Sequence, residues 1–284
     1  LRTHAFRGSL KGIEELEDRT MLTSTFSIDI NHSVDEGDSG TRDVVLTVTR
    51  TGTTAGDLNS AVTVDYATQD NSASTADNDY LAISGTLTFS ADTDAVTQTQ
   101  TITVQVNGDT QAEGTEDFDV LLSNIQADNS DVTFENDQSN ISILNDDQAQ
   151  LSIEDVTVDE GAGYVTLTVS LDIPADDILN VDYTTTPGLI ASSPDDFEQT
   201  SGTLIFLPGE TSKELYVNII DNQTPGYDAP FYVQLSNLQS GNVDAVIADD
   251  SAVVTITDND REFRDLHYDF EYKSAILPYE LTQD

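Results

Sequence analysis

Five short motifs occur twice in this chain, in the same order, and no other feature constrains its fold as strongly. A chain that repeats a set of motifs in order is expected to fold as two matching domains. The pairs are SVDEGDSG (33–40) and TVDEGAG (157–163), VTVDYAT (62–68) and LNVDYTT (179–185), SGTLTF (84–89) and SGTLIF (201–206), LLSNIQ (121–126) and QLSNLQ (234–239), and ISILNDD (141–147) and VTITDND (254–260).

Each copy is predicted to be an immunoglobulin-like antiparallel β-sandwich of about seven strands. Segments such as DVVLTVTR (43–50) and TITVQV (101–106) alternate apolar and polar residues, and clusters of Gly, Asn and Asp separate them. Seven short strands in roughly 110 residues are typical of this all-β fold. The strands expected in the first copy cover 26–30, 43–50, 61–68, 82–90, 98–106, 116–125 and 139–145.

The repeats divide the chain into four parts. Residues 26–147 form the first expected domain and 151–260 the second, and the short link between them predicts a near-linear tandem. Residues 1–25 are interpreted as a leader or anchor-like segment. Residues 261–284, with the alternating motif HYDFEY, are either a tail or the start of a further domain.

Acidic residues outnumber basic ones by 53 to 10, which gives a net charge of −43. Between residues 24 and 260 there are 43 acids but only three cations, Arg42, Arg50 and Lys213. Side-chain ion pairs therefore leave most of this negative charge uncompensated. Such a surface repels phosphate backbones, so nucleic acid is excluded as an expected partner.

Both copies carry carboxylates directly after a strand, at Asp146 and Asp147 and again at Asp258 and Asp260. Two carboxylates about 4 Å apart repel by roughly 4 kcal/mol near a protein surface, and a divalent cation offsets this repulsion. Calcium suits several oxygen ligands from flexible loops, and magnesium is the second choice. Zinc and copper fit poorly, since the chain has three His and no Cys. The alternative is that the acidic loops are solvated and serve only solubility.

The order of the motifs xEG, VDYxT, DY, SGTLxF, an acidic loop, LSN and a terminal acidic run resembles the Calx-beta repeat of sodium–calcium exchangers and bacterial surface proteins. The resemblance covers residues 26–260. It implies a sandwich that holds calcium at one end. The implied ligands are Glu36, Asp79, Asp109, Glu113, Asp146 and Asp147 in the first copy, and Glu160, Asp196, Asp221, Asp258 and Asp260 in the second.

Both copies depart from the pattern of the Calx-beta repeat. In the first copy, Asn145 and Gly108 stand where the family usually has acids. In the second copy, Asn222 and Asn259 replace acids, and Gly226 takes the place of the first copy's loop glutamate. The second copy is therefore expected to bind fewer ions, to bind them weakly, or to bind none.

The expected function is a calcium-binding structural or adhesive tandem of a secreted or cell-surface bacterial protein. Calcium would order the strand-end loops and stiffen the junction between the domains. The chain has no G-x-S-x-G, P-loop or H-E-x-x-H motif, so it is predicted not to be an enzyme. Two alternatives stay open: a metal-independent spacer, and an accessory module of a larger surface hydrolase.

The expected partners are calcium ions and other surface proteins or further repeats of the same parent chain. No apolar run reaches about 18 residues, so no transmembrane segment is predicted. The segment from Leu16 to Ser24, LEDRTMLTS, resembles an LEDR motif near the start of many planctomycete surface proteins, which implies export or anchoring. An accidental match within a floppy leader is the alternative interpretation.

Overall fold

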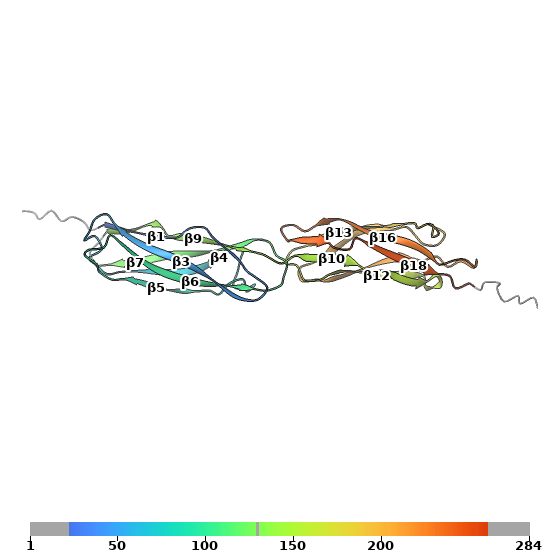
Figure 1. Cartoon of the computed structure of the whole chain (residues 1–284), viewed down its shortest axis with the longest axis horizontal. Coiled ribbons are helices and arrows are strands. Elements are labelled where there is room, and N and C mark those ends of the chain that lie inside the picture. Colours follow the sequence, from blue (N-terminus) through green and yellow to red (C-terminus); the bar gives the residue numbers. More distant parts are fainter. Residues whose placement is uncertain (1–22, 129–130, 261–284) are drawn as a thin grey trace, which may run out of the picture. The chain divides into compact units, whose positions relative to one another are not determined.

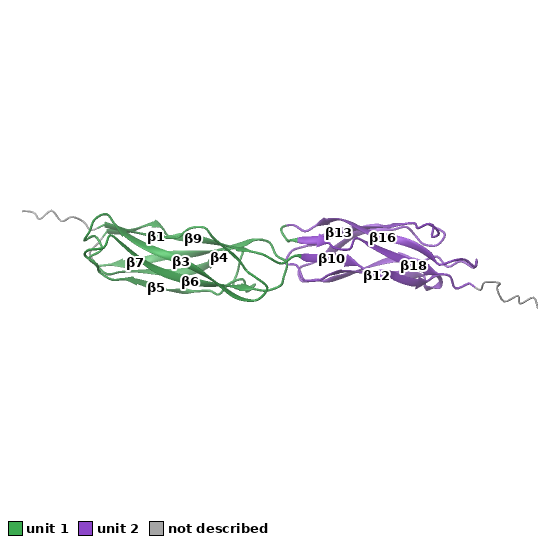
Figure 2. Cartoon of the chain, viewed as in Figure 1, with its two compact units in different colours: residues 1–148, 242–244 green, residues 149–241, 245–284 purple. Residues whose placement is uncertain are grey.

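The computed structural model describes residues 23–128 and 131–260, which form strands and one short 3-10 helix, η1 (Glu160–Ala162) (Figure 1). These residues divide into two compact units (Figure 2): unit 1 ends at Gln148 and includes 242–244, and unit 2 begins at Ala149. The LEDR motif, most of the predicted leader and the predicted tail lie outside the described residues. No helix in the described ranges has the length and hydropathy needed to cross a membrane.

Unit 1 consists of two sheets, one of four strands in the order β6-β3-β1-β8 and one of five in the order β2-β9-β7-β4-β5. The strands are β1 (Thr23–Ile28), β2 (His32–Asp35), β3 (Gly40–Gly52), β4 (Val62–Asp70), β5 (Ser84–Phe89), β6 (Thr97–Gly108), β7 (Glu116–Ala127), β8 (Asp131–Asn136) and β9 (Gln138–Leu144).

Unit 2 repeats this topology, with sheets in the order β15-β12-β10-β17 and β11-β18-β16-β13-β14. Its strands are β10 (Ala149–Ile153), β11 (Val156–Asp159), β12 (Tyr164–Leu171), β13 (Leu179–Thr186), β14 (Ser201–Phe206), β15 (Ser212–Asn218), β16 (Ala229–Gln239), β17 (Ala245–Ile247) and β18 (Ser251–Thr257).

The predicted all-β tandem of sandwiches is confirmed, but the described part of each unit has nine strands rather than about seven. In unit 1 the two additional strands are β2 and β8, which lie at sheet edges. β1 ends at Ile28, and after Asn31, which has a φ of 57°, the chain joins the other sheet as β2, parallel to β9. β8 pairs in parallel with β1 before the chain crosses into β9.

The period-2 alternation of the sequence sets the core. Val44, Leu46 and Val48 of β3 are buried, and Ile102 and Val104 of β6 lie opposite them in the register and are also buried. Burying each such aliphatic side chain contributes about 1.5–3 kcal/mol. The residues between them, Val45 and Thr47 on β3 and Thr103 on β6, face outward, which leaves function to the sheet faces and the loops.

Two of the repeated motifs meet as neighbours on adjacent strands. Tyr66 of β4 lies opposite Gly85 of β5, and a Cβ atom on Gly85 would lie 2.7 Å from the Tyr66 hydroxyl. In unit 2, Tyr183 and Gly202 have the same arrangement, with a corresponding distance of 2.8 Å. The repeated glycine therefore provides the space that the tyrosine ring occupies.

Hydrogen bonds within the sheet, rather than a metal, account for the repeated aspartate of the VDY motif. Asp65 accepts hydrogen bonds from the Asn124 amide and the Thr86 hydroxyl, each 2.6 Å long. Asn124 has a φ of 50° and lies at the β-bulge between β4 and β7. The hydrogen bond from Asn124, followed by that from Thr86, holds the pKa of Asp65 below its ordinary value.

Candidate metal centre

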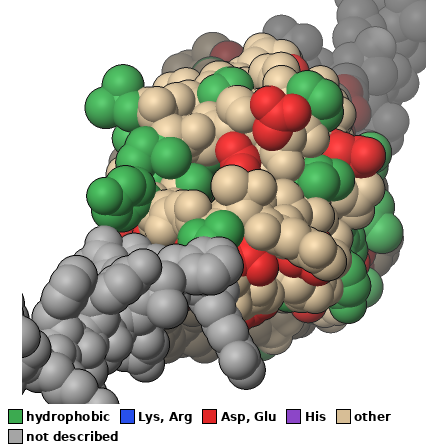
Figure 3. Space-filling model, turned by 90° about the vertical axis from the view of Figure 1, so that its right-hand side faces the viewer, with side chains coloured by type: hydrophobic (Ala, Val, Ile, Leu, Met, Phe, Trp, Pro, Cys, Tyr) green, Lys and Arg blue, Asp and Glu red, His purple; other side chains and the backbone are tan. Residues whose placement is uncertain are grey.

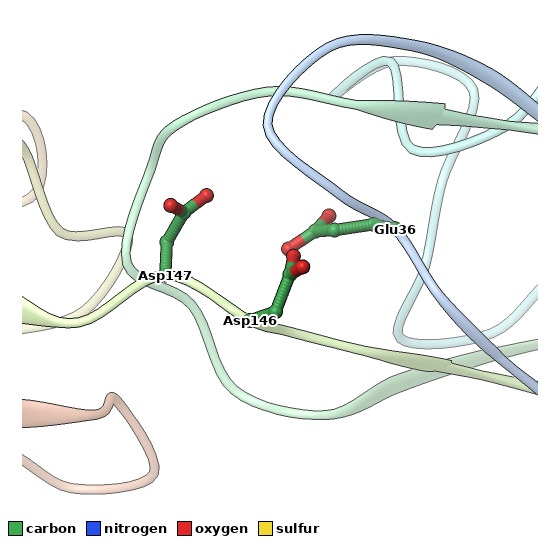
Figure 4. Close-up of side chains that lie close together, drawn as sticks. All are labelled: Glu36, Asp146 and Asp147. Carbon is green, nitrogen blue, oxygen red and sulfur yellow. The ribbon is translucent and has the colours of Figure 1, made fainter.

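The acidic end of unit 1 is formed where two parallel strands finish side by side. The last residues of β2 and β9, Asp35 and Leu144, are paired in the register, and the Glu36 N–H continues the ladder to the Leu144 carbonyl at 3.1 Å. Glu36 and Asp146 consequently leave the sheet together, and Asp147 follows. One carboxylate oxygen from each of these three residues lies within 4.8 Å of the others (Figure 4).

The turn after β9 is shaped by hydrogen bonds. The Gly37 N–H donates to Oδ1 of Asp146 at 2.9 Å. The Asn145 side chain donates to the Asp147 carbonyl at 2.7 Å and accepts from the Asp147 N–H at 3.2 Å. Asn145, which stands where the family usually has an acid, therefore fixes the backbone that carries Asp147.

Glu36 is the buried carboxylate of this group. Its side chain is only 4% exposed, and Oε1 is buried without a hydrogen-bond partner. Burial, followed by the charges of Asp109, Asp147, Asp146 and Asp79, raises the pKa of Glu36 to about 7. A buried carboxylate oxygen without a donor is costly, and a cation coordinated there would remove that cost.

Within the described part of the chain, no side-chain cation forms an ion pair with the carboxylates at this end of unit 1. Arg42 lies close by, but its Nε donates to the Glu36 carbonyl at 2.9 Å and it forms no ion pair with the carboxylates. Within the residues that the structure describes, the ion pair present joins Lys213 to Glu210. Oδ2 of Asp147 is also buried without a partner, and burial followed by the charge of Asp38 raises its pKa.

A second group of carboxylates lies at the same end of unit 1. One oxygen each from Asp79, Glu113 and Glu116 lies within 4.8 Å of the others. Asp79 accepts a hydrogen bond from the Ser74 N–H at 2.6 Å, and burial raises its pKa. Glu116 is not among the ligands predicted from the sequence, because the sequence predicts that a strand begins at this residue. Its spacing of three residues from Glu113 was the available signal.

Aromatic packing holds Asp79 at the rim of the sandwich. The next residue, Tyr80, is buried, and its ring stacks on Phe118 at a centroid distance of 3.9 Å and an interplanar angle of 9°. In unit 2, Phe197 stacks on Phe231 at 4.1 Å and 10°. The phenylalanine that follows Asp196 in place of a tyrosine therefore preserves this stack.

Asp109 contributes to the acidic end mainly through its charge. It belongs to neither of the two groups, and its Oδ1 accepts from the Gln111 N–H at 2.7 Å. Its charge contributes to the raised pKa of Glu36, Asp79 and Asp147. A Cβ atom on the preceding Gly108 would lie only 1.9 Å from the Gly37 carbonyl oxygen, which explains why an acid is absent there.

Unit 2 brings Glu160, Asp258 and Asp260 together in the same way, with one oxygen from each within 4.8 Å. Glu160 is 4% exposed, but it accepts hydrogen bonds from the Asn259 N–H at 3.0 Å and the Asn222 amide at 3.3 Å. Figure 3 looks onto the end of unit 2 and shows Asp and Glu side chains, with no Lys or Arg among the described residues in view.

The other carboxylates of unit 2 differ in their hydrogen-bond donors and in their burial. Asp258 accepts from the Gly226 N–H at 2.5 Å and the Asp260 N–H at 3.0 Å. Oδ2 of Asp260 is buried without a partner, and burial followed by the charges of Asp258 and Asp221 raises its pKa. Asp196 accepts from the Ser192 N–H at 2.8 Å and lines an open pocket with Glu160 and Asp258. Asp196 and Asp221 lie outside the three-residue group.

Comparisons with known proteins identify both units. The family model of the Calx-beta domain matches residues 23–147 and 145–260. Sodium/calcium exchanger 2 of rat and of human are each 39% identical to this chain over 93 residues, which is 28% of this chain and 10% of each exchanger. Rat sodium/calcium exchanger 1 is 39% identical over 95 residues, again 28% of this chain and 10% of the exchanger. The chain thus spans about a tenth of the length of these relatives.

Two solved structures also resemble the chain. The crystal structure of CBD12 from CALX1.2 is 21% identical, with a TM-score of 0.38, and the match covers 82% of this chain and 99% of that one. The apo-form Calx CBD1 domain is 25% identical, with a TM-score of 0.36, and covers 39% of this chain and 98% of that one.

Proposed function

This chain belongs to the Calx-beta domain family, and from that premise we propose that unit 1 binds calcium ions at its acidic end. The observation that carries the proposal is the buried Oε1 of Glu36, which has no hydrogen-bond partner and lies among the carboxylates of Asp146 and Asp147. A divalent cation would supply both the missing contact and the missing positive charge.

The donor set favours calcium over other metals. All residues of the two groups in unit 1 offer carboxylate oxygens, and they come from separate loops rather than from one rigid segment. Calcium accepts six to eight oxygen ligands in flexible geometry, whereas magnesium requires a tighter octahedron. Zinc and copper prefer imidazole or thiolate ligands, which neither group provides.

We assign unit 2 a different role, because its buried glutamate already has donors. Asn259 and Asn222 donate to Glu160, so the position of this carboxylate does not depend on an ion. Unit 2 would then bind calcium more weakly than unit 1 or not at all, and would serve mainly as a rigid structural repeat.

The proposed biological role is calcium-dependent support or adhesion at a bacterial cell surface or in a secreted protein. Only Gln148 separates Asp147 from Ala149, where β10 begins, so an ion that orders Asp147 would restrain the junction between the units. Extracellular calcium modules have Kd values of roughly 10⁻⁴–10⁻³ M. At millimolar calcium, each site would then stabilise the fold by about 1 kcal/mol.

Calx-beta domains are binding domains rather than catalytic ones, which supports a non-enzymatic role for these two units. An alternative is that the two units are accessory modules of a larger surface hydrolase. A metal-independent spacer is the competing function, and the melting temperature distinguishes it: a spacer melts identically in calcium and in chelator.

Isothermal titration of the full chain with calcium tests the proposal. We expect binding heat for the parent chain, loss of that heat in the double variant Asp146→Ala and Asp147→Ala, and little change in the matched variant Asp258→Ala and Asp260→Ala. No heat in the parent chain, with circular dichroism showing intact folding, would refute calcium binding. Equal losses in both variants would refute the assignment to unit 1.

A further inference from the structure

A pair of exposed tyrosines lies on the outer face of the four-stranded sheet of unit 2. Tyr164 of β12 is 57% exposed and Tyr216 of β15 is 55% exposed. Their ring centroids are 6.0 Å apart with an interplanar angle of 61°. Tyr216 lies opposite Thr166 in the register, so the two rings form a diagonal pair on adjacent strands.

The backbone sets the outward direction of both rings, and a neighbouring acid holds the ring of Tyr216. Val165 and Val217, which follow the two tyrosines in their strands, are buried in the core, so both rings must face solvent. The Tyr216 hydroxyl donates to the Glu214 carboxylate, which lies on the same face of β15. The Tyr216 ring is therefore held in place before any ligand arrives, which lowers the entropy cost of ordering it on binding.

The surroundings of the pair are hydroxyl-rich rather than aliphatic. The outward-facing residues that follow along β12 are Thr166, Thr168 and Ser170, and Ser170 contacts Ser152 of β10 through their hydroxyls at 3.3 Å. A protein interface would need a wider apolar area at its centre. Aromatic rings bordered by hydroxyls and a carboxylate suit a ligand that has both apolar faces and many hydroxyls.

A sugar ring has this combination, since its C–H faces stack on aromatic rings and its hydroxyls form hydrogen bonds. The net charge of −43 repels anionic ligands, which argues against acidic sugars. We propose that Tyr164 and Tyr216 form a binding surface for a neutral polysaccharide. Tyr164 begins β12 four residues after Glu160, so the surface borders the acidic end of unit 2, but neither tyrosine belongs to its three-carboxylate group. The proposed binding to polysaccharide therefore requires no calcium.

Unit 1 does not carry this surface. In the register of β3 and β6, the buried pair Val44 and Val104 corresponds to Val165 and Val217 of unit 2. The positions equivalent to Tyr164 and Tyr216 are then Asp43 and Thr103, so the aromatic pair is absent there. Only unit 2 is expected to bind the polysaccharide.

Affinity electrophoresis of the full chain tests this proposal, with gels that contain hydroxyethylcellulose, xylan, galactomannan or starch, run in chelator. We expect at least one of these to retard the parent chain. Tyr164→Ala and Tyr216→Ala should each weaken the interaction about tenfold or more, which corresponds to roughly 1.4 kcal/mol. The matched control is Tyr232→Ala, which removes a 42% exposed tyrosine from the other sheet of unit 2 and should change nothing.

Three outcomes would overturn the proposal. The first is retardation of the parent chain by none of the four polysaccharides. The second is equal retardation of the parent chain and of both tyrosine variants, with thermal melts showing that the variants are folded. The third is a concentration-dependent dimer of the parent chain that Tyr216→Ala abolishes, which would assign the pair to a second copy of the chain.

Discussion

The backbone N–H of Asn259 donates a hydrogen bond of 3.0 Å to the Glu160 carboxylate, and this contact distinguishes the two units chemically. Glu36 occupies the same turn in unit 1, yet one of its oxygens is buried without any donor. The buried glutamate of this repeated motif thus differs between the two units in its hydrogen-bond partners, although burial raises its pKa in both. One glutamate is satisfied by the protein, and the other has an unmet requirement for a donor or a cation.

Replacing both asparagines of unit 2 should make it depend on metal. In the double variant Asn222→Asp and Asn259→Asp, Glu160 loses the amide donor of Asn222 and gains two like charges nearby. We expect unit 2 to lose about 1–3 kcal/mol of stability in chelator, and calcium to restore much of it. Thermal melts in chelator and in calcium would measure this. Asn218→Asp is the control, since Asn218 donates to Glu198 on the sheet surface and its replacement should create no calcium effect.

Glu36→Gln should have opposite effects on the stability of unit 1 in chelator and in calcium. Above the pKa of Glu36, the variant removes an uncompensated buried charge, so the metal-free unit 1 should become more stable, by up to about 3 kcal/mol. In calcium, the same variant should lose most of the stabilisation that the ion provides. Chemical denaturation with and without calcium measures the change in the free energy of unfolding in each condition. A variant that is less stable in chelator would contradict our account of Glu36, and Glu160→Gln should leave the calcium effect unchanged.

The raised pKa of Glu36 predicts how pH acts on unit 1. The folded unit keeps a proton up to about pH 7, whereas the unfolded chain releases it near 4.5. The metal-free unit therefore loses stability as pH rises between these values, and its stability levels off above them. Calcium must displace this proton, so its affinity should weaken by about tenfold per pH unit below 7. Calcium titrations at several pH values check this, and a pH-independent affinity would exclude Glu36 as a ligand.

The sequence predicted the parts of the fold that depend on local pattern. The alternation in DVVLTVTR and TITVQV located β3 and β6, whose inward and outward faces follow from period 2 alone. It did not predict β2 or β8, because each is short and pairs in parallel with a strand about 100 residues away. Such pairing depends on where the chain crosses between sheets, and here Asn31 and its positive φ set that point for β2.

The candidate site was predictable as a set of residue types but not as a set of contacts. Repeated acids after a strand indicated Asp146 and Asp147, and the resemblance to the Calx-beta repeat implied Glu36. The three carboxylates lie together in the structure. That Glu160 accepts a backbone N–H could not be read from the sequence, because an N–H direction depends on the turn that carries it. Gly108 is a similar case, since its lack of a side chain reflects the approach of the Gly37 carbonyl rather than a lost ligand.

Gly108→Ala should therefore damage both the fold and the proposed site. The new Cβ atom would lie 1.9 Å from the Gly37 carbonyl oxygen and 2.6 Å from that of Glu36, so the turn that carries Glu36 must move. We expect a loss of about 2 kcal/mol or more in stability and weaker calcium binding by unit 1. Gly226→Ala is the matched control, because the nearest atom to its Cβ would lie 3.7 Å away. Equal melting temperatures of the two variants would contradict this prediction.

The repeated LSN motif offers a test of whether backbone geometry or a hydrogen bond explains its asparagine. Asn124 has a φ of 50° and donates to Asp65 at 2.6 Å, and Asn237 has a φ of 53° and donates to Asp182 at 2.8 Å. Asn124→Gly keeps the backbone conformation and loses the hydrogen bond, whereas Asn124→Ala loses both. The alanine variant should therefore be about 1–2 kcal/mol less stable than the glycine variant.

A second measurement on these variants isolates the hydrogen bond. The Asn124 amide is the largest cause of the low pKa of Asp65. The pKa of Asp65, followed by NMR titration of its carboxyl carbon, should rise toward its ordinary value by the same amount in Asn124→Gly and Asn124→Ala. Asp182 in unit 2 keeps its own donors, Thr203 and Asn237, so its pKa should stay low in both variants. If the two variants melt at the same temperature while Asp65 titrates normally in both, the hydrogen bond alone accounts for the asparagine, and its positive φ carries no strain.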